Sequence, residues 1–251
     1  MRFAGKCVLV IGATEGIGRA TARAFCEEGA NVVIAGLGPD RGQELAQELA
    51  SASKSEAVYV ECDVTHEQEV RSLTEFAVRR FGRIHAAVNN AGTEGPFGPL
   101  HERTSEEFDR LLNVNLKGVW LGMKYQIPHM LERGGGAIVN TASSAGVRAI
   151  ANIALYTASK YGVVGLTKAA ALEVARSNIR INAVAPGPVD TGLLHRMVGG
   201  HVALSVIAEK VAMGRISKPE EIAQTILWLC SDAASFITAQ TIVADGGLTE
   251  A

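Results

Sequence analysis

The chain has 251 residues, of which 47% are hydrophobic, and its 24 basic and 26 acidic residues give a formal net charge of -2 at pH 7. Such a chain can bury a large core, and a near-neutral charge argues against nucleic acid as its main partner. The sequence has no uninterrupted apolar run of about 18 residues, which argues against a membrane span, and no signal-peptide pattern before Lys6.

The four cysteines, Cys7, Cys26, Cys62 and Cys230, have none of the close spacings that metal ligands or redox motifs show. Cys7 opens an apolar strand-like run and Cys26 falls on an amphipathic helix, so we expect buried free thiols in a reducing compartment. No cluster of His, Cys, Asp or Glu has metal-ligand spacing either. The sequence therefore predicts a soluble, cytoplasmic protein that binds no metal.

The first predicted unit is a buried strand at residues 7–11, a glycine-rich turn at 12–18 and a helix that runs to about Glu28. Glycines at a strand-to-helix turn let the backbone approach a pyrophosphate, and the helix N-terminus offers free N-H groups. At the start of a βαβ unit this pattern favours a dinucleotide site over a purely structural turn.

The rest of the chain continues the same alternation. Further strands are predicted at residues 31–35, 58–61, 86–89, 137–141, 179–185 and 241–244. Further helices are predicted at about 40–50, 65–80, 104–130 and 153–177, with a last helix that starts near 217. Seven strands alternating with helices indicate an α/β fold, a Rossmann-type doubly wound parallel sheet with helices on both faces. We expect one domain over residues 1–251.

Two pairs of residues have the spacing of helix capping boxes: Thr65 with Gln68, and Thr104 with Glu107. They predict the starts of the third and fourth helices. Asn115 falls in the middle of the long fourth helix, where an asparagine usually costs some stability.

Asn89-Asn90-Ala91-Gly92 follows the fourth strand, at the edge of the sheet where such proteins bind ligands. Small residues there keep the backbone close to a cofactor. We interpret Asn89 as mainly structural, because its amide can tie neighbouring strand ends together, and Gly92 as a lining residue.

Tyr156 and Lys160 have the i, i+4 spacing that places two side chains on one helix face, and Ser143 lies thirteen residues before Tyr156. A nearby ammonium favours the phenolate and lowers the pKa of a tyrosine from about 10 toward the range of a general acid or base. Lowering this pKa to near neutral pH takes roughly three pKa units, or about 4 kcal/mol. We therefore expect a second positive charge nearby, such as an oxidised nicotinamide ring.

Residues 192–214 break the alternation of strands and helices, with Gly199 and Gly200 adjacent to each other. A segment of this length between regular elements is often an active-site lid, which we predict here.

In their order and spacing these motifs resemble the short-chain dehydrogenase/reductase family over nearly the whole chain. The matching motifs are Gly12-x-x-x-Gly16-Ile17-Gly18, Asp63-Val64, Asn89-Asn90-Ala91-Gly92, Asn115 in Asn113-Val114-Asn115, Ser143, Tyr156 with Lys160, and Pro186-Gly187.

The resemblance implies an NAD(P)-dependent oxidoreductase that interconverts a secondary alcohol and a ketone by hydride transfer. Tyr156 would be the general acid/base, and Ser143 would hydrogen-bond the substrate oxygen. Lys160 would lower the pKa of Tyr156 and bond the nicotinamide ribose. Asn115 would hold a water in the proton path, at a local irregularity of its helix.

The resemblance also assigns the cofactor contacts. Asp63 and its neighbour would flank the adenine, while Val189, through its backbone, and Thr191, through its hydroxyl, would meet the nicotinamide carboxamide. Ile11 stands where the family usually has a threonine that bonds near the asparagines. The expected cofactor-binding residues are Gly12, Thr14, Glu15, Gly16, Ile17, Gly18, Gly36, Leu37, Asp63, Val64, Asn90, Ala91, Gly92, Tyr156, Lys160, Pro186, Gly187, Val189 and Thr191.

The cofactor preference depends on the end of the second strand, where Gly36 and Leu37 offer neither an acid for a ribose hydroxyl nor an arginine for a 2′-phosphate. Glu15 would repel that phosphate, whereas Arg41 could swing toward it. We weigh the fixed acid above the flexible arginine and expect NAD, with NADP as the alternative.

Three other functions remain open from the sequence. One is a 3-oxoacyl-thioester reductase, the second an epimerase or dehydratase of the family's extended branch, and the third a non-catalytic dinucleotide-binding module. The substrate would be a small-molecule alcohol or ketone. Its candidate contacts are Glu94, Phe97, Ser144, Arg148, Asn152, Pro188 and the 192–214 segment.

Family members commonly pair through two long helices, here 105–131 and 153–177, and through the last helix and strand. The resemblance therefore implies a homotetramer. The apolar content of those helices exceeds what one face of a sheet needs.

Overall fold

The computed structural model describes residues 1–53, 55–199 and 203–251, and its strands form one seven-stranded sheet. The strand order is β3-β2-β1-β4-β5-β6-β7, and every pairing is parallel. This confirms the predicted Rossmann-type doubly wound sheet. The strands are β1 (Cys7–Ile11), β2 (Asn31–Gly36), β3 (Ala57–Glu61), β4 (Ala86–Asn89), β5 (Gly136–Thr141), β6 (Ile179–Pro186) and β7 (Thr241–Ala244).

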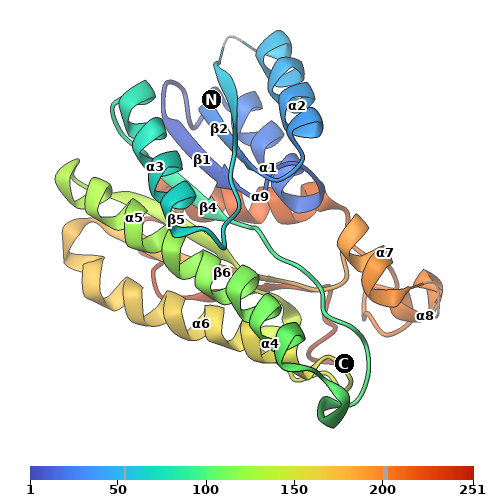
Figure 1. The fold of residues 1–251 in the computed structure, drawn as a ribbon. Coiled ribbons are helices and arrows are strands. Elements are labelled where there is room, and N and C mark those ends of the chain that lie inside the picture. Colours follow the sequence, from blue (N-terminus) through green and yellow to red (C-terminus); the bar gives the residue numbers. More distant parts are fainter. Residues whose placement is uncertain (54, 200–202) are drawn as a thin grey trace.

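Helices cover both faces of the sheet (Figure 1). One face carries α1 (Gly16–Glu27), α2 (Pro39–Ala52) and α9 (Pro219–Cys230). The other face carries α3 (Glu67–Phe81), α5 (Gly118–Glu132) and α6 (Ala154–Val174), and α4 (Ser105–Leu112) packs against α6. Two short helices, α7 (Gly192–Val198) and α8 (Leu204–Ala208), lie to one side of this layered body, near the C-terminus (Figure 1).

The alternation of side chains along β1 divides the core into two layers. Val8 and Val10 pack into the layer under α1, α2 and α9, whereas Leu9 and Ile11 pack into the layer under α3, α5 and α6. All of β1 is buried, as a central parallel strand requires. The chain reverses its direction of winding at β1, between β2 and β4, so the carboxyl ends of β1 and β4 flank the expected ligand crevice.

The long fourth helix is confirmed, but it contains an irregular turn. Thr104 and Glu107 form the predicted capping box, with the Glu107 amide donating to Thr104 Oγ1 at 3.2 Å and the Thr104 amide to Glu107 Oε2 at 3.0 Å. Residues Asn113–Lys117 then form a π-helical turn between α4 and α5, with Asn115 at its centre. Such turns are rare and occur frequently at functional sites.

The predicted capping box at Thr65 and Gln68 is wrong. His66 occupies the N-cap position of α3, and its side chain makes no hydrogen bond to the first turn of that helix. Thr65 instead donates its hydroxyl to Asp63 Oδ1 at 2.8 Å, because the carboxylate captures it in a local turn after β3. The capping-box spacing is therefore present without its hydrogen bonds.

All four cysteines are buried and free, as the sequence predicted. Within the described residues, no helix is long and apolar enough to span a membrane. The same residues contain no group of three or more His, Cys, Asp or Glu side chains that could hold a metal ion.

Candidate active site

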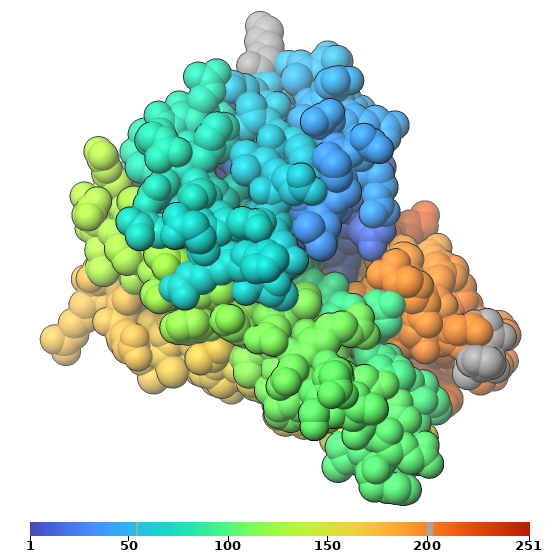
Figure 2. Space-filling model, viewed as in Figure 1, coloured from blue at the N-terminus to red at the C-terminus, as the bar shows by residue number. Residues whose placement is uncertain are grey.

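A large cleft of about 1770 Å³ opens along the carboxyl ends of the central strands. Figure 2 shows the surface hollowed where the blue N-terminal part, the green residues that follow β4 and the orange α7 segment meet. Nearly every expected cofactor-binding residue lines this cleft, as do Ser143, Tyr156 and Lys160. Gly18 and Asn115 do not line it, so their roles must be indirect.

The glycine-rich turn is shaped by close backbone contacts. Gly12 has a φ of +83°, and a Cβ on it would collide with the main chain of Ala91. A Cβ on Gly18 would strike the carbonyl oxygen of Gly12, so Gly18 packs the helix against the turn rather than meeting a ligand. Asn90 Nδ2 donates to that same carbonyl oxygen at 2.8 Å, which ties the turn to the loop after β4. Thr141 Oγ1, at 3.1 Å from Asn90 Oδ1, supplies the hydroxyl that is absent at position 11.

The start of α1 fits the phosphates of a dinucleotide. Its N-cap residue, Glu15, makes no side-chain hydrogen bond to the first turn, and that turn contains no acidic residue. The first N-H groups of the helix are therefore uncapped by side chains, and with the helix dipole they favour an anion. Gly16 leaves room here, since a Cβ on it would come within 3.1 Å of Thr191 Cγ2 across the cleft.

The adenosine end of the cleft has one charged pair that the sequence did not reveal. Arg41 Nη1 lies 2.8 Å from Glu15 Oε2, so the two side chains that pull the cofactor preference in opposite directions bind one another. Leu37 is exposed and uncharged. Asp63 is engaged in the turn with Thr65 through one carboxylate oxygen, in keeping with a turn residue that also lines the cleft.

Tyr156 and Lys160 lie one turn apart on α6, and their side chains are buried, with 8% and 3% of their surfaces exposed. Lys160 Nζ lies 5.7 Å from the centre of the Tyr156 ring and donates to the main-chain oxygen of Thr141 at 2.9 Å. Ser143 follows β5, and its Oγ accepts from the amide of Ala145 at 3.1 Å, which fixes the hydroxyl oxygen beside the tyrosine.

The pKa of Tyr156 is raised, and not lowered by the neighbouring ammonium as the sequence predicted. Burial raises the pKa of Tyr156, the Ser143 hydroxyl lowers it, and the charge of Glu94 raises it. Burial also lowers the pKa of Lys160 to about 8. Burial thus disfavours the charged forms of both side chains.

Asn115 ties the loop after β4 to α6. Its Oδ1 accepts from the Thr93 amide at 2.7 Å, and its Nδ2 donates to the Thr93 carbonyl at 3.0 Å and to Ser159 Oγ at 3.1 Å. A Cβ on Gly92 would lie 3.4 Å from Asn115 Oδ1 and 3.5 Å from Lys160 Nζ. Gly92 therefore lies against the side chains of both Asn115 and Lys160, where a larger residue would press on them.

Asn89 is structural, as predicted. Its amide exchanges hydrogen bonds with Gln126 and donates to Asn140 at 2.8 Å. Asn140 in turn donates to Thr167 Oγ1 at 2.9 Å. These buried amides join β4, β5, α5 and α6 below the site.

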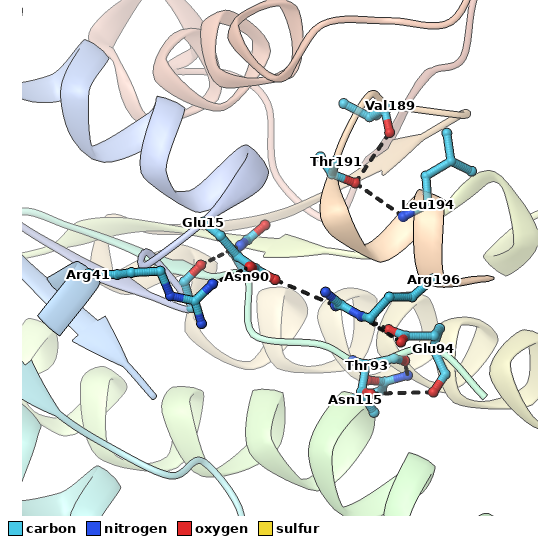
Figure 3. A network of polar contacts seen from close by, with 11 residues as sticks. Glu15, Arg41, Asn90, Thr93, Glu94, Asn115, Val189, Thr191, Leu194 and Arg196 are labelled. Carbon is cyan, nitrogen blue, oxygen red and sulfur yellow. Dashed lines mark hydrogen bonds and ion pairs between the residues drawn. The ribbon is translucent and has the colours of Figure 1, made fainter. Parts of the chain in front are cut away.

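At the nicotinamide end, an isolated β-bridge positions the segment that contains Val189 and Thr191. Val189 pairs with Ser217 in parallel, and the Ser217 amide and carbonyl bond Pro188 and Asp190. Thr191 Oγ1 donates to the Val189 carbonyl at 3.2 Å and accepts from the Leu194 amide at 3.4 Å, which starts α7 (Figure 3). Ser217 was not predicted, because nothing in its local sequence marks the bridge.

Of the expected substrate contacts, Phe97, Ser144, Arg148 and Pro188 line the cleft, together with much of the 192–214 segment. Part of that segment, including Gly200 and His201, lies outside the described residues. Glu94 and Asn152 do not line the cleft. The remaining walls around the substrate end are mainly apolar: Pro96, Ala145, Ala149, Ile150, Ile153, Leu193, Leu194, Met197 and Leu248.

Comparison with known proteins agrees with this geometry. A family model described as enoyl-(acyl carrier protein) reductase matches residues 12–249. The chain is 40% identical to a 2,5-dichloro-2,5-cyclohexadiene-1,4-diol dehydrogenase of Sphingobium indicum, over 98% of each protein. It is also 40% identical to a cyclohexanol dehydrogenase of an Acinetobacter species, over 99% of this chain and 96% of that one.

Two solved structures superpose on it closely. Levodione reductase gives a TM-score of 0.97 at 35% identity and full coverage of both chains. The protein ElxO with NADP bound gives a TM-score of 0.92 at 32% identity, covering 98% of this chain and 99% of that one.

The strand order, the glycine-rich turn and the buried Tyr156–Lys160 pair beside Ser143 define a dehydrogenase of the Rossmann class. The chain belongs to the short-chain dehydrogenase/reductase family. It is an NAD(P)-dependent oxidoreductase that acts on CH-OH groups and interconverts a secondary alcohol and a ketone.

Proposed function

We propose that Tyr156 is the general acid/base of this reaction, with Ser143, Lys160 and Asn115 as its partners. The observation that carries the proposal is the convergence of Ser143, Tyr156 and Lys160 on one end of the cleft, where the tyrosine and lysine are almost fully buried. A buried phenol beside a fixed hydroxyl can move a proton to or from a substrate oxygen without competition from bulk water.

Each of these residues has a defined task. Ser143 hydrogen-bonds the substrate oxygen where charge develops, and Tyr156 accepts the hydroxyl proton in oxidation or returns it in reduction. Lys160 keeps one donor on Thr141 and has others left for the nicotinamide ribose. Asn115 holds the loop after β4 against α6 at the π turn, and its proposed part in the proton path is therefore indirect. Bound NAD(P) supplies the hydride acceptor or donor and, when oxidised, a positive ring charge.

The cofactor would be held along the cleft by the residues expected from the sequence. The uncapped start of α1 would face the pyrophosphate, while Val189 and Thr191 would meet the carboxamide. We propose NAD as the preferred cofactor. The support is that Leu37 carries no charge and Arg41 is already paired with Glu15.

We propose a small alicyclic secondary alcohol, or its ketone, as substrate. The mainly apolar walls around the catalytic end support it, since apolar walls bind rings with few polar groups. The names of two relatives, a cyclohexanol dehydrogenase and a cyclohexadiene-diol dehydrogenase, point to the same class.

The test is an absorbance assay of the reduced nicotinamide with three substrate types and both cofactors. We expect turnover with cyclohexanol and cyclohexanone to exceed turnover with acetoacetyl-coenzyme A. Faster reaction with the thioester would favour the 3-oxoacyl-thioester reductase instead. No turnover with any alcohol or ketone, together with cofactor binding, would support the non-catalytic module.

Four further features are proposals. The exposed apolar side chains of the long helices, including Phe108, Trp120, Tyr161 and Leu172, support a homotetramer. The free, buried cysteines support a cytoplasmic location. The single continuous sheet supports one domain. α7 and α8 together bury only one side chain, that of Leu194. Such sparse packing against the rest of the protein supports a substrate lid at 192–214.

A further inference from the structure

Residues 245–251, which we call the terminal segment, follow β7 and run along the cleft. Leu248, Thr249 and Ala251 line it. Leu248 is the large apolar side chain among them, and it is partly buried. In Figure 1 the end of the chain marked C lies beside the segment that leads into α6. The terminal segment is therefore part of the wall of the site.

Asp245 begins the terminal segment and fixes its shape. Only 8% of the surface of this residue is exposed. Its two carboxylate oxygens accept from the amides of Gly247 and Thr249, at 2.9 and 2.8 Å, and such bonds to a charged acceptor are strong. A Cβ on Gly187 would lie 2.8 Å from Asp245 Cα, so the segment starts packed against the turn after β6.

Arg148 holds the other end of the terminal segment through its main chain. Arg148 Nη1 donates to the main-chain oxygen of Leu248 at 2.9 Å. The main-chain oxygens of Ala251 and Thr249 lie 3.3 and 3.4 Å from the same nitrogen. The guanidinium therefore faces carbonyl oxygens of the protein, and the Leu248 side chain is left to line the cleft.

Arg148 is itself fixed next to the catalytic end of the cleft. Its amide donates to the main-chain oxygen of Ser144 at 2.9 Å, in the turn directly after Ser143. That turn packs closely on α6, because a Cβ on Gly146 would lie 2.8 Å from the main-chain oxygen of Lys160. Arg148 thus links the wall that carries Leu248 to the turn that follows Ser143.

The 192–214 segment, which we propose as a lid, is joined to the body of the protein at two places. On α7, Arg196 Nε lies 2.7 Å from Glu94 Oε1 in the loop after β4 (Figure 3). Beyond α8, the Met213 amide donates to the main-chain oxygen of Gly246 at 3.1 Å. The terminal segment therefore also contacts the far end of the proposed lid.

We infer that Leu248 sets the size of the ring that the site accepts, and that Arg148 is the positioning residue that holds Leu248 in place. The inference rests on the proposed alicyclic substrate and names one wall of its pocket. Apolar walls select rings by size, because a group that does not fit, or that leaves a gap, changes transition-state binding. Arg148 acts through the main chain of the terminal segment instead of touching the substrate.

Two alcohols of different size, cyclohexanol and 4-tert-butylcyclohexanol, test the role of Leu248 in the full chain. The measured quantity is the ratio of their kcat/KM values. Leu248→Ala enlarges the site, so we expect the preference for cyclohexanol to fall about fivefold.

Arg148→Met removes the bond to the Leu248 carbonyl and should lower the same ratio about threefold, mainly through KM for cyclohexanol. The value of kcat and the dissociation constant of the cofactor should stay within about twofold of wild type, because neither the catalytic residues nor the cofactor contacts change. Arg148→Lys keeps a charged donor and should lie between the wild type and Arg148→Met.

A double variant separates positioning from direct contact with the substrate. If Arg148 acts through Leu248, adding Arg148→Met to Leu248→Ala should change the ratio by less than about 1.5-fold. The matched control is Arg83→Met, which removes an arginine bound to the Gly135 carbonyl at 2.9 Å, before β4 and β5 and away from the cleft. This control should leave the ratio unchanged.

An unchanged ratio in Leu248→Ala would overturn the inference. Effects that multiply fully in the double variant would also overturn it and would place Arg148 against the substrate itself. Should Arg148→Met not fold, Arg148→Lys takes its place in the double variant with the same criteria. A wild type that turns over neither alcohol would remove the proposed substrate class and the inference with it, whereas turnover with unchanged ratios in the variants defeats only the role of the terminal segment.

Discussion

In the proposed mechanism Lys160 belongs to the catalytic group around Tyr156 and also holds the nicotinamide ribose. Its removal should therefore affect both the reaction rate and cofactor binding. Its ammonium is buried, and it bonds Thr141 while leaving donors for the nicotinamide ribose. Lys160→Ala should therefore lower kcat by about a hundredfold or more and also weaken cofactor binding several-fold. Fluorescence titration with the cofactor, alongside steady-state rates, measures both. Unchanged cofactor affinity would remove the ribose contact from the mechanism.

His85, far from the chemistry, predicts how stability depends on pH. Its Nδ1 accepts from the Cys7 amide at 2.9 Å. Burial, with the charges of Arg83 and Lys6, lowers its pKa from 6.5 to about 4. Between these values the unfolded chain binds more protons than the folded one, so stability is present above pH 6.5 and is lost as the pH falls toward 4.

A variant His85→Gln should lose that contribution while keeping an acceptor for the Cys7 amide. Denaturant midpoints measured at several pH values across this window provide the test. We expect the wild type to lose more stability than the variant as the pH falls. Parallel pH dependences in the two proteins would show that His85 does not titrate as described.

At the residue scale the sequence predicted the class of reaction better than the contacts. Ser143, Tyr156, Lys160 and Asn115 were proposed from the order and spacing of several motifs together with the family resemblance, and their roles stay predictions. The pairing of Glu94 with Arg196 was not, since the two residues are 102 positions apart and only the fold brings them together. The effect of burial on the tyrosine also required the structure.

The proposed preference for NAD depends on the glycine-rich turn and on the two helices beside it. Glu15 at the start of α1 is bound to Arg41 on α2, so the acid both repels a 2′-phosphate and occupies the arginine that could bind one. Glu15→Gln should release Arg41 and move the ratio of kcat/KM for NADP over NAD upward by about tenfold.

Steady-state kinetics with both cofactors and one alcohol measures this ratio. Arg41→Ala in the Glu15→Gln background should return it toward the wild-type value. A wild type that already prefers NADP, and that loses this preference in Arg41→Ala, would reverse the assignment and show that Arg41 binds phosphate despite Glu15.

Element boundaries followed from hydrophobic periodicity and from glycines. The strands predicted at 7–11, 86–89 and 241–244 match β1, β4 and β7, and the other four differ from the prediction by one residue. The error at Thr65 arose because a capping pattern does not reveal a competing partner, here the Asp63 carboxylate. The resemblance, rather than periodicity, anticipated an irregularity at Asn115.

The long helices expose more apolar side chains than are needed to pack them against one face of the sheet. Leu172 on α6 is 73% exposed, and Trp120 and Tyr161 are also exposed on the long helices. Leu172→Glu should disrupt assembly, whereas Leu100→Glu, at an exposed leucine outside the proposed interface, should not. Light scattering at micromolar concentration should give four times the 26.4 kDa chain mass for the wild type. A monomeric wild type would contradict the homotetramer.

The central claim is that Tyr156 moves the proton while other residues hold the cofactor. The most direct test measures Tyr156→Phe and wild type side by side, recording formation of the reduced nicotinamide with a cyclic alcohol and the dissociation constant of the cofactor. We expect a rate at least about a hundredfold lower and cofactor binding unchanged within about twofold. A phenylalanine variant that keeps more than about a hundredth of the wild-type rate would contradict the assignment of Tyr156 as general acid/base.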